Sequence, residues 1–166
     1  MRLALQVING LEREGLIRRP AIGGAMALLF HDEPVVTFDL DVFCLLPQSG
    51  LLVSLEPVYG SLRARGYQAE AEAVVIGGVP VQFIPAYNEL VTEAVEQAEE
   101  RSFDGVPARV LTVEHLLAIM VQTNRPKDRE RLASMAGRVA MDRDRLTAIL
   151  SRHHLLSAWK ALNFAC

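Results

Sequence analysis

The chain has 166 residues and a formal net charge of -3, with 51% hydrophobic and 22% charged residues. This composition predicts one domain, or a small domain with an appended helical part, and excludes an intrinsically disordered chain. The negative net charge excludes binding to nucleic acid through overall charge. The two cysteines, Cys44 and Cys166, are too few for a disulfide framework. The longest apolar run is too short for a membrane span and the charged start does not resemble a signal peptide, so we expect a cytoplasmic protein.

The first two thirds of the chain predict a small mixed sheet with helices. Apolar residues at helical spacing predict a first helix that ends at Gly15. Two β-type runs joined by Gly77–Gly78 predict a hairpin, because glycine supplies the positive φ angles of a tight turn. The expected elements in chain order are a helix over 3–14, a strand over 17–22, a helix over 25–31, a turn over 31–34, a strand over 36–46, a helix over 51–66, the hairpin over 68–86, an acidic helix over 88–101 capped by Asn88, and a strand over 105–112.

The last third of the chain predicts helices only. Thr112 is a suitable N-cap for a helix over 113–123, and Pro126 suits the first turn of the next one. Asp142 is expected to begin a further helix, which leads to a last segment around Trp159. We therefore expect an α+β fold with a small mixed β-sheet flanked by helices, divided into an α/β core over 1–111 and a helical C-terminal region over 112–166 that packs on the core.

Two carboxylates lie one residue apart in the stretch TFDLDVF. Side chains alternate along a strand, so Asp39 and Asp41 point to one face, whereas Phe38, Leu40, Val42 and Cys44 point to the other and are expected in the core. Either bulk water or a divalent cation offsets the repulsion between the two charges. The face of the two acids also carries Phe43, so it is not simply a wet face. Mg²⁺ favours a few carboxylate oxygens together with substrate phosphates, which this pair can supply.

A glycine pair, Gly23–Gly24, lies between an expected strand and an expected helix. Such a turn lets the backbone approach a ligand closely, and the helix start offers free N–H groups to a phosphate. No Gly-Lys-Ser/Thr sequence follows, so the turn is not a Walker loop, and it is not a dinucleotide fingerprint. Alone, a glycine pair in this position is more often ordinary turn chemistry.

The combination of these two features is more specific than either part. The glycine turn Gly23–Ala27 followed on the next strand by Thr37-x-Asp39-x-Asp41 resembles the nucleotidyltransferase fold of the DNA polymerase β type. More narrowly, it resembles the minimal bacterial nucleotidyltransferase-like proteins that include AbiEii-type toxins. A second similarity lies in the helical segment that ends in Arg-x-Lys-Asp, here Arg125, Lys127 and Asp128. The resemblance covers roughly residues 18–135.

The resemblance implies a metal-dependent transfer of a nucleoside monophosphate from a nucleoside triphosphate, such as ATP, to a hydroxyl of unknown origin on RNA or protein. Asp39 and Asp41 would hold Mg²⁺ or Mn²⁺, and Gly23–Gly24 with Thr37 would lie at the nucleotide phosphates. Lys127 would act as a point charge on the triphosphate. A toxin or antitoxin partner is a further implication of the resemblance.

One residue departs from the pattern. The resemblance implies a third carboxylate on the second strand of the hairpin, and Gln82 stands there instead. A neutral amide cannot act as a base, and Glu70 and Glu72 on the first hairpin strand are the alternatives. Metal and nucleotide binding are therefore better supported than turnover. The alternative hypothesis is a catalytically degenerate nucleotidyltransferase-fold protein that serves as a nucleotide-binding, regulatory or antitoxin-like partner.

The remaining candidates carry weaker signals. A haloacid-dehalogenase-type phosphatase also fits the stretch around Asp41, but Asp142 and Asp144, the only later acidic pair of the right kind, fall in an expected helix. The adjacent rings of His153 and His154 splay apart on a helix, so we expect surface residues there, and His115 is expected to be an ordinary helix-face residue.

Overall fold

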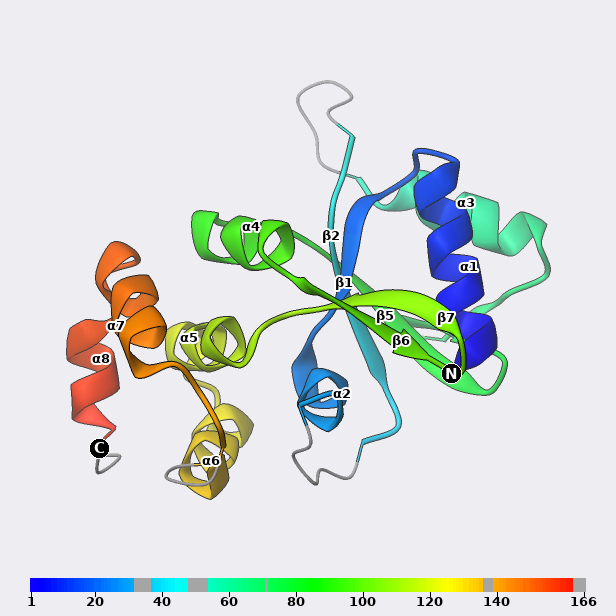
Figure 1. Cartoon of the computed structure of the whole chain (residues 1–166). Helices are drawn as coiled ribbons and strands as arrows, with labels where there is room; N and C mark the ends of the chain where they lie inside the picture. Colours follow the sequence, from blue (N-terminus) through cyan, green and yellow to red (C-terminus); the bar gives the residue numbers. More distant parts are fainter. Residues whose placement is uncertain (32–36, 48–53, 71, 136–138, 163–166) are drawn as a thin grey trace.

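The computed structural model of the chain describes residues 1–31, 37–47, 54–70, 72–135 and 139–162. Helices and strands alternate in the first two thirds and helices alone follow (Figure 1). The helices are α1 (Arg2–Arg13), α2 (Gly24–Leu29), α3 (Glu56–Ala64), α4 (Glu89–Glu96), α5 (Val113–Thr123), α6 (Pro126–Met135), α7 (Arg143–Arg152) and α8 (Leu156–Ala161). The strands are β1 (Arg18–Ile22), β2 (Leu40–Leu45), β3 (Ala69–Glu70), β4 (Ala73–Ile76), β5 (Val79–Pro85), β6 (Glu99–Phe103) and β7 (Val106–Val110).

The described strands form one mixed sheet in the order β3-β4-β5-β2-β1-β7-β6. β2 is antiparallel to β1 and parallel to β5, and β1 is parallel to β7. The acid-bearing strand β2 therefore lies in the centre of the sheet, between the strand that leads into the glycine turn and the second strand of the hairpin (Figure 1).

The two faces of β2 are covered differently. Leu5 and Ile8 of α1 line the same small internal space as Val42, so α1 covers the Val42 face. Gly23 contacts the ring of Phe43 closely, so the glycine turn and α2 cover the opposite face. Asp41 shares that face with Phe43 because side chains alternate along the strand. The candidate site thus lies on the side of the sheet away from α1.

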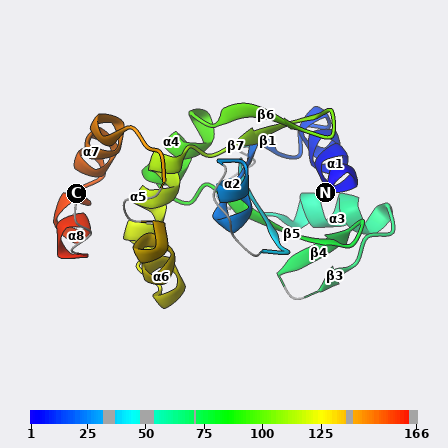
Figure 2. The ribbon, with the colours of Figure 1, turned by 60° about the horizontal axis from the view of Figure 1, so that its bottom comes forward.

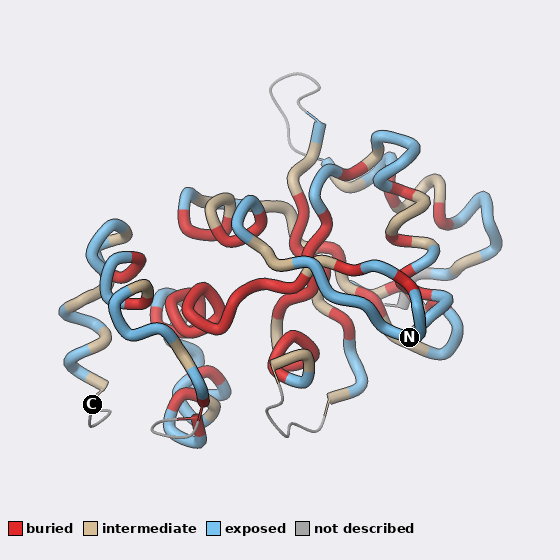
Figure 3. Tube along the Cα trace, in the orientation of Figure 1, coloured by how far each residue is buried: buried red, intermediate tan, exposed pale blue. Residues whose placement is uncertain are grey.

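The C-terminal helices are organised around α5. All its residues from Val113 to Val121 are buried, and it packs against α4, α6 and α7 (Figure 3). The predicted caps are confirmed, since Thr112 accepts a hydrogen bond from the His115 amide and Asp142 from the Arg145 amide. Because α5 also packs on the core, the division into 1–111 and 112–166 stays a prediction. No described helix is long and apolar enough to cross a membrane.

The predicted α+β class is confirmed, with several corrections to its elements. β2 begins at Leu40, so Asp39 precedes the strand, and Phe38 is 80% exposed instead of lying in the core. α3 begins at Glu56, and the expected start of that helix, like the turn over 32–34, lies outside the described residues. The acidic helix ends at Glu96, and the charged stretch Glu99–Phe103 forms β6. This edge strand is largely exposed, so no alternating apolar pattern marks it in the sequence.

Candidate functional site

The acid pair lies at the start of the central strand, and its two members have different surroundings. Asp39 is exposed, and the Thr37 hydroxyl donates a hydrogen bond to its Oδ1 at 2.5 Å. This bond lowers the pKa of Asp39. Asp41 is half-buried, and burial first and the charge of Asp39 second raise the pKa of its carboxyl group. Burial and the neighbouring acid thus oppose the ionised form of Asp41, which a bound cation would stabilise.

The glycine turn is built directly against Asp41. The Gly23 amide donates a hydrogen bond to the Asp41 carbonyl at 2.9 Å. Gly24 has φ +58°, and a Cβ atom at this position would overlap the Asp41 carboxylate. A Cβ atom at Gly23 would overlap the ring of Phe43. Only glycine fits both positions, and the turn lies directly against Asp41.

Helix α6 directs positive charge toward the acid pair. Lys127 and Arg131 are four residues apart, so they share one side of the helix. The positive charges of both contribute to the lowered pKa of Asp39. Together with that of Arg125, they oppose the rise in the pKa of Asp41. In Figure 1, α6 and α2 both lie at the lower edge of the molecule, and Figure 2 shows α6 directly after α5. The positive charges of Lys127 and Arg131 thus act on the acids, while the role of Lys127 at a triphosphate stays a prediction; Arg131 is an addition that its spacing from Lys127 would have indicated.

Asp128 is buried at the start of helix α6 and is not one of the residues beside the acid pair. Its side chain is 1% exposed. It accepts hydrogen bonds from the Thr123 hydroxyl and from Arg125 Nε, each at 2.7 Å. These bonds hold the start of α6, so within the Arg-x-Lys-Asp sequence Asp128 positions the helix that carries Lys127. Asp128 is therefore not part of a solvated helix face.

Gln82 occupies the sheet position next to Asp41. The two residues are register partners in the parallel pair of β2 and β5, so their side chains share a face. Gln82 Nε2 donates a hydrogen bond to Glu72 Oε2 at 3.1 Å, which brings one of the two alternative acids to this position. The side chain of Glu70, the other one, lies outside the described residues. No three His, Cys, Asp or Glu side chains of the described ranges gather as a metal site.

A cavity of about 590 Å³ adjoins Gln82 at the edge of β5. α3 supplies one wall, and β5 with the turn before β4 supplies the other. Glu72 and Gln82 line it, but Tyr59 of α3 packs on Phe83, the register partner of Val42, so the α3 wall lies on the face of the sheet away from Asp41. The lining residues are Leu55, Glu56, Tyr59, Arg63, Glu72, Gln82, Phe83, Ile84 and Pro85.

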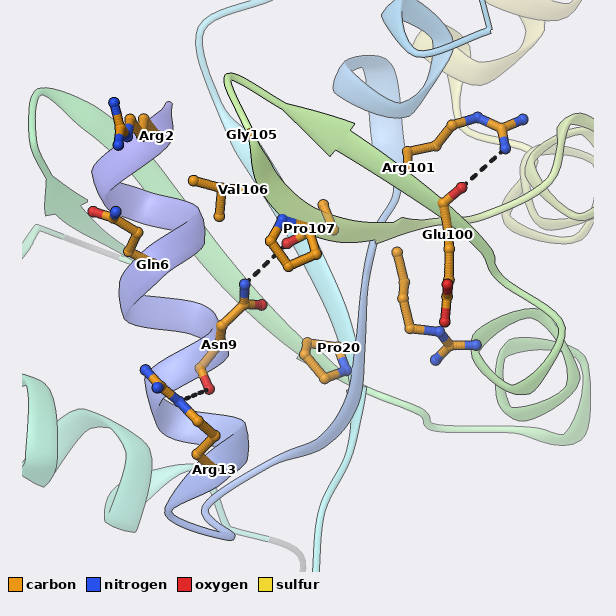
Figure 4. Close-up of a pocket in the computed structure, with 12 residues that line it drawn as sticks. Arg2, Gln6, Asn9, Arg13, Pro20, Glu100, Arg101, Gly105, Val106 and Pro107 are labelled. Carbon is orange, nitrogen blue, oxygen red and sulfur yellow. Dashed lines mark hydrogen bonds between the residues drawn. The ribbon is translucent and has the colours of Figure 1, made fainter.

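A second cavity, of about 600 Å³, lies on the side of the sheet that α1 covers (Figure 4). α1 and the β6–β7 hairpin form its walls, and Asn9 Nδ2 donates a hydrogen bond to the Pro107 carbonyl at 2.9 Å between them. Arg101, which also lines this space, forms an ion pair with Glu99. Because α1 covers the Val42 face of β2, this cavity is separate from the acid pair.

Glu93 is the centre of a different polar cluster, between α4, α5 and α7. His153 Nε2 lies 2.7 Å from one carboxylate oxygen, Arg152 forms an ion pair with the other, and Nε2 of the buried His115 lies 3.5 Å from it. Burial alone would raise the pKa of Glu93, but the hydrogen bonds from Arg152 and His153 lower it to about 2. The predictions of a surface His153 and an ordinary helix-face His115 are therefore wrong, because both side chains help to attach the C-terminal helices to the core.

Comparisons with known proteins add structural similarity at low identity. The solution structure of the antibiotic-resistance factor ANT(2'')-Ia is 13% identical, with a TM-score of 0.49 over 97% of this chain and 94% of that chain. No protein-family model matches the sequence, and a search of curated proteins found no match. At this score the similarity does not define the fold, whereas strand order and register do. A strand, a glycine turn, a short helix, a central acid-bearing strand and an adjacent parallel strand form the mixed sheet of this α+β fold.

Proposed function

We propose that the protein is a metal-dependent nucleotidyltransferase that transfers a nucleoside monophosphate from a nucleoside triphosphate to an acceptor hydroxyl. The observation that carries this proposal is the convergence of Asp39 and Asp41 with the positive charges of Lys127 and Arg131. Acids and cations that face each other without forming direct ion pairs leave room for a ligand of mixed charge. A metal–triphosphate complex is such a ligand, because it presents a cation to the acids and phosphate oxygens to the basic side chains.

Mg²⁺ or Mn²⁺ fits the donor set that the chain offers. Asp39 and Asp41 supply two carboxylates, and these hard cations complete their coordination with water and substrate phosphates. The raised pKa of Asp41 agrees with this assignment, because a carboxyl group that is disfavoured as an anion gains most from a bound cation. When bound, the ion neutralises charge that develops on the attacking and leaving oxygens.

The other residues bind and orient the nucleotide. The guanidinium of Arg131 is suited to two phosphate oxygens at once, and Lys127 supplies a compact positive charge. The turn Gly23–Gly24 lets the triphosphate approach the backbone beside Asp41, where any side chain would intrude. Thr37 holds Asp39 in one orientation by its hydrogen bond. Gln82 can orient a neighbouring group through its amide, but it cannot accept a proton.

The alternative is a catalytically degenerate nucleotidyltransferase-fold protein that binds a nucleotide or a regulatory partner without transfer. The neutral Gln82 beside Asp41, together with the absence of a third carboxylate at the acid pair among the described residues, favours this reading. RNA or protein as the acceptor, a toxin or antitoxin partner and a cytoplasmic location stay predictions of the sequence.

The test separates binding from transfer. ATP binding is measured by calorimetry in Mg²⁺ and Mn²⁺, and transfer is measured with α-labelled ATP, with water, RNA and protein as acceptors. We expect Asp41→Asn to abolish binding in Mg²⁺, and Asp144→Asn, an exposed acid on α7, to leave it unchanged. Binding with no transfer to any acceptor would favour the regulatory alternative. Equal ATP affinity in the parent and Asp41→Asn would contradict the metal–nucleotide site.

A further inference from the structure

We infer that the cavity between α1 and the β6–β7 hairpin is a binding site for a small molecule that carries two or more phosphate groups. The cavity lies on the side of the sheet that α1 covers, away from Asp41, so it is a second site (Figure 4). The inference goes beyond the proposed function and does not depend on it.

Arginine side chains surround this cavity. Its lining includes four arginines and one glutamate, although the whole chain carries a net charge of -3. Arg2 and Arg13 belong to α1, whereas Arg101 and Arg109 belong to β6 and β7. Figure 4 shows Arg2 and Arg13 near the two ends of α1, with Arg101 on the hairpin across from them. Positive charge is therefore concentrated at one place on an acidic chain, which favours an anionic ligand there.

Acids of the described residues balance only part of this charge. Arg101 forms an ion pair with Glu99 at 2.6 Å. Arg13 Nε donates a hydrogen bond to the Asn9 carbonyl at 3.3 Å, and neither Arg13 nor Arg2 forms an ion pair with a described carboxylate. The two guanidinium groups of α1 are therefore available to an anion.

Arg109 is the least exposed of the four arginines. Its guanidinium donates hydrogen bonds to the carbonyls of Glu96 and Ala98, at 3.2 and 3.0 Å, and forms no ion pair with a described carboxylate. Burial first and the charge of Arg19 second lower the pKa of Arg109, and nearby acids oppose this only in part. Because a half-buried cation without a paired anion is costly, a bound phosphate would stabilise it.

The walls of the cavity are fixed before any ligand enters. The hydrogen bond from Asn9 Nδ2 to the Pro107 carbonyl, at 2.9 Å, joins α1 to β7. Pro20 and Pro107 both line the space, and the ring of a proline restricts its φ angle. A site that is formed in advance loses less conformational entropy on binding.

The size of the cavity and the spacing of its charges define the ligand class. A volume of about 600 Å³ suits a small molecule. Arg2 and Arg13 are separated by about 16 Å along the axis of α1, so they favour separate anionic groups on one ligand. Phosphates suit these positions, because each carries up to about two charges and has oxygens that match the fork of a guanidinium.

The same lining disfavours a nucleic-acid strand. Proteins that bind single strands combine positive charge with aromatic side chains on which the bases stack. No aromatic side chain is among the described residues that line this cavity. The phosphates of the ligand, and not its bases, are therefore the groups that the cavity can recognise.

The test uses three probes on one ring: inositol, inositol 1-phosphate and inositol 1,4,5-trisphosphate. Each is titrated into ¹⁵N-labelled protein without metal or ATP, while the side-chain amide signals of Gln6 and Asn9 are followed. We expect the trisphosphate to shift both signals at a concentration about tenfold lower than the monophosphate, and inositol to shift neither. Added salt should weaken the binding of the trisphosphate.

Substitutions on α1 test which charges bind the phosphates. Arg2→Gln and Arg13→Gln change exposed side chains, so we expect normal folding and an affinity for the trisphosphate about tenfold lower in each variant. Arg143→Gln is the matched control, because Arg143 is an exposed arginine of α7 and its loss changes the net charge equally. The control should bind the trisphosphate as the parent does, and circular dichroism of each variant should match the parent.

Four outcomes would overturn the inference. Equal affinities for the monophosphate and the trisphosphate would mean that the cavity takes a single anion. An equal loss in Arg143→Gln, or no shift at Gln6 and Asn9, would mean that charge attraction acts without a defined site. Tighter binding of citrate would indicate carboxylates, and tighter binding of hexauridylate would indicate a nucleic-acid surface. Because the titrations contain neither metal nor ATP, none of these outcomes bears on the acid pair.

Discussion

Two carboxylates of this molecule, Glu93 and Asp41, have pKa values shifted in opposite directions. Glu93 receives Arg152 and two histidines from the C-terminal helices, and its pKa falls to about 2. Asp41 has no such direct partner among the described residues, and its pKa is raised by burial and by Asp39. Internal ion pairs thus complete the Glu93 cluster, whereas the positive charges that face Asp41 act on it from a distance. The difference separates an acid that holds helices together from one that is available to a ligand.

The largest effect is expected from Gly24→Ala. The residue has φ +58° and its added methyl group would overlap the Asp41 carboxylate, so the turn or the acid must move. We expect a loss of about 2–3 kcal/mol in the free energy of unfolding and no measurable ATP binding. The control is Gly78→Ala, which has φ +80° with nothing within 4 Å, and it should cost about 1 kcal/mol with unchanged ATP affinity. Equal losses of ATP affinity in both variants would contradict the role of Gly24 at Asp41.

Glu93→Gln tests the other side of the comparison. The substitution removes the charge that Arg152 and His153 share, so we expect a loss of about 2 kcal/mol in denaturant unfolding and unchanged ATP affinity. Glu89→Gln, an exposed position on the same helix, should cost less than about 0.5 kcal/mol. A fall in ATP affinity at normal stability would mean that the Glu93 cluster belongs to the nucleotide site.

The Glu93 cluster also predicts the response to acid. The folded-state pKa of Glu93, about 2, lies below its value in the unfolded chain, so its contribution to stability is present above pH ~4.3 and is lost as the pH falls toward 2. The free energy of unfolding of the parent should therefore fall more steeply between pH 5 and 3 than that of Glu93→Gln, as urea titrations at each pH will measure. Parallel pH profiles would show that Glu93 is not held ionised by its partners.

Arg131→Gln tests whether α6 contributes to the site. Removing the guanidinium takes away a charge-assisted contact to phosphate, so we expect the affinity for ATP in Mg²⁺ to fall about tenfold, with little change in stability. Arg129→Gln is the matched control, because Arg129 Nε donates a hydrogen bond to the Asn124 carbonyl and its charge is not among the largest that act on the acid pair. An equal effect of the two substitutions would indicate general charge attraction instead of a binding contact.

The smallest expected effects separate the two aspartates. The repulsion between the two negative charges, taken alone, predicts that neutralising either aspartate stabilises the metal-free protein. The raised pKa of Asp41 agrees, so Asp41→Asn should raise the melting temperature at pH 7 by about 1–2 °C. The lowered pKa of Asp39 has the opposite sign, because its ionised form gains from Thr37, so Asp39→Asn should lower the melting temperature slightly. Shifts of the same sign in calorimetry would contradict this difference.

Local chemistry made much of the fold predictable from the sequence. Asn88, Thr112 and Asp142 all cap helices as expected, and Gly77 and Gly78 both adopt the positive φ angles of the hairpin turn. Such rules depend on a few neighbouring residues. They failed at Phe38, which extends the apolar pattern of β2 but lies before the strand starts, because the length of a strand depends on its partners in the sheet.

The candidate site was predictable only where it is local in sequence. The glycine turn and the acid pair were visible as motifs, whereas the contact of Gly24 with Asp41 depends on the packing of α2 on β2. The approach of Glu72 to Gln82 depends on the fold of the turn before β4, and the position of Arg131 depends on where α6 packs. Glu93 joins residues some sixty positions later in the chain, which no spacing rule connects.

The most direct measurement of the central claim uses Mn²⁺ as a paramagnetic probe. Mn²⁺ is added with ATP to ¹⁵N-labelled protein, and the broadening of each backbone amide signal is recorded. The account predicts that the amides of Gly24, Asp41 and Gln82 broaden first and that Asp41→Asn removes the effect, because the ion is held by the acid pair at the glycine turn. Broadening centred on Glu89, Glu93 and Glu96 of α4, or unchanged in Asp41→Asn, would contradict it.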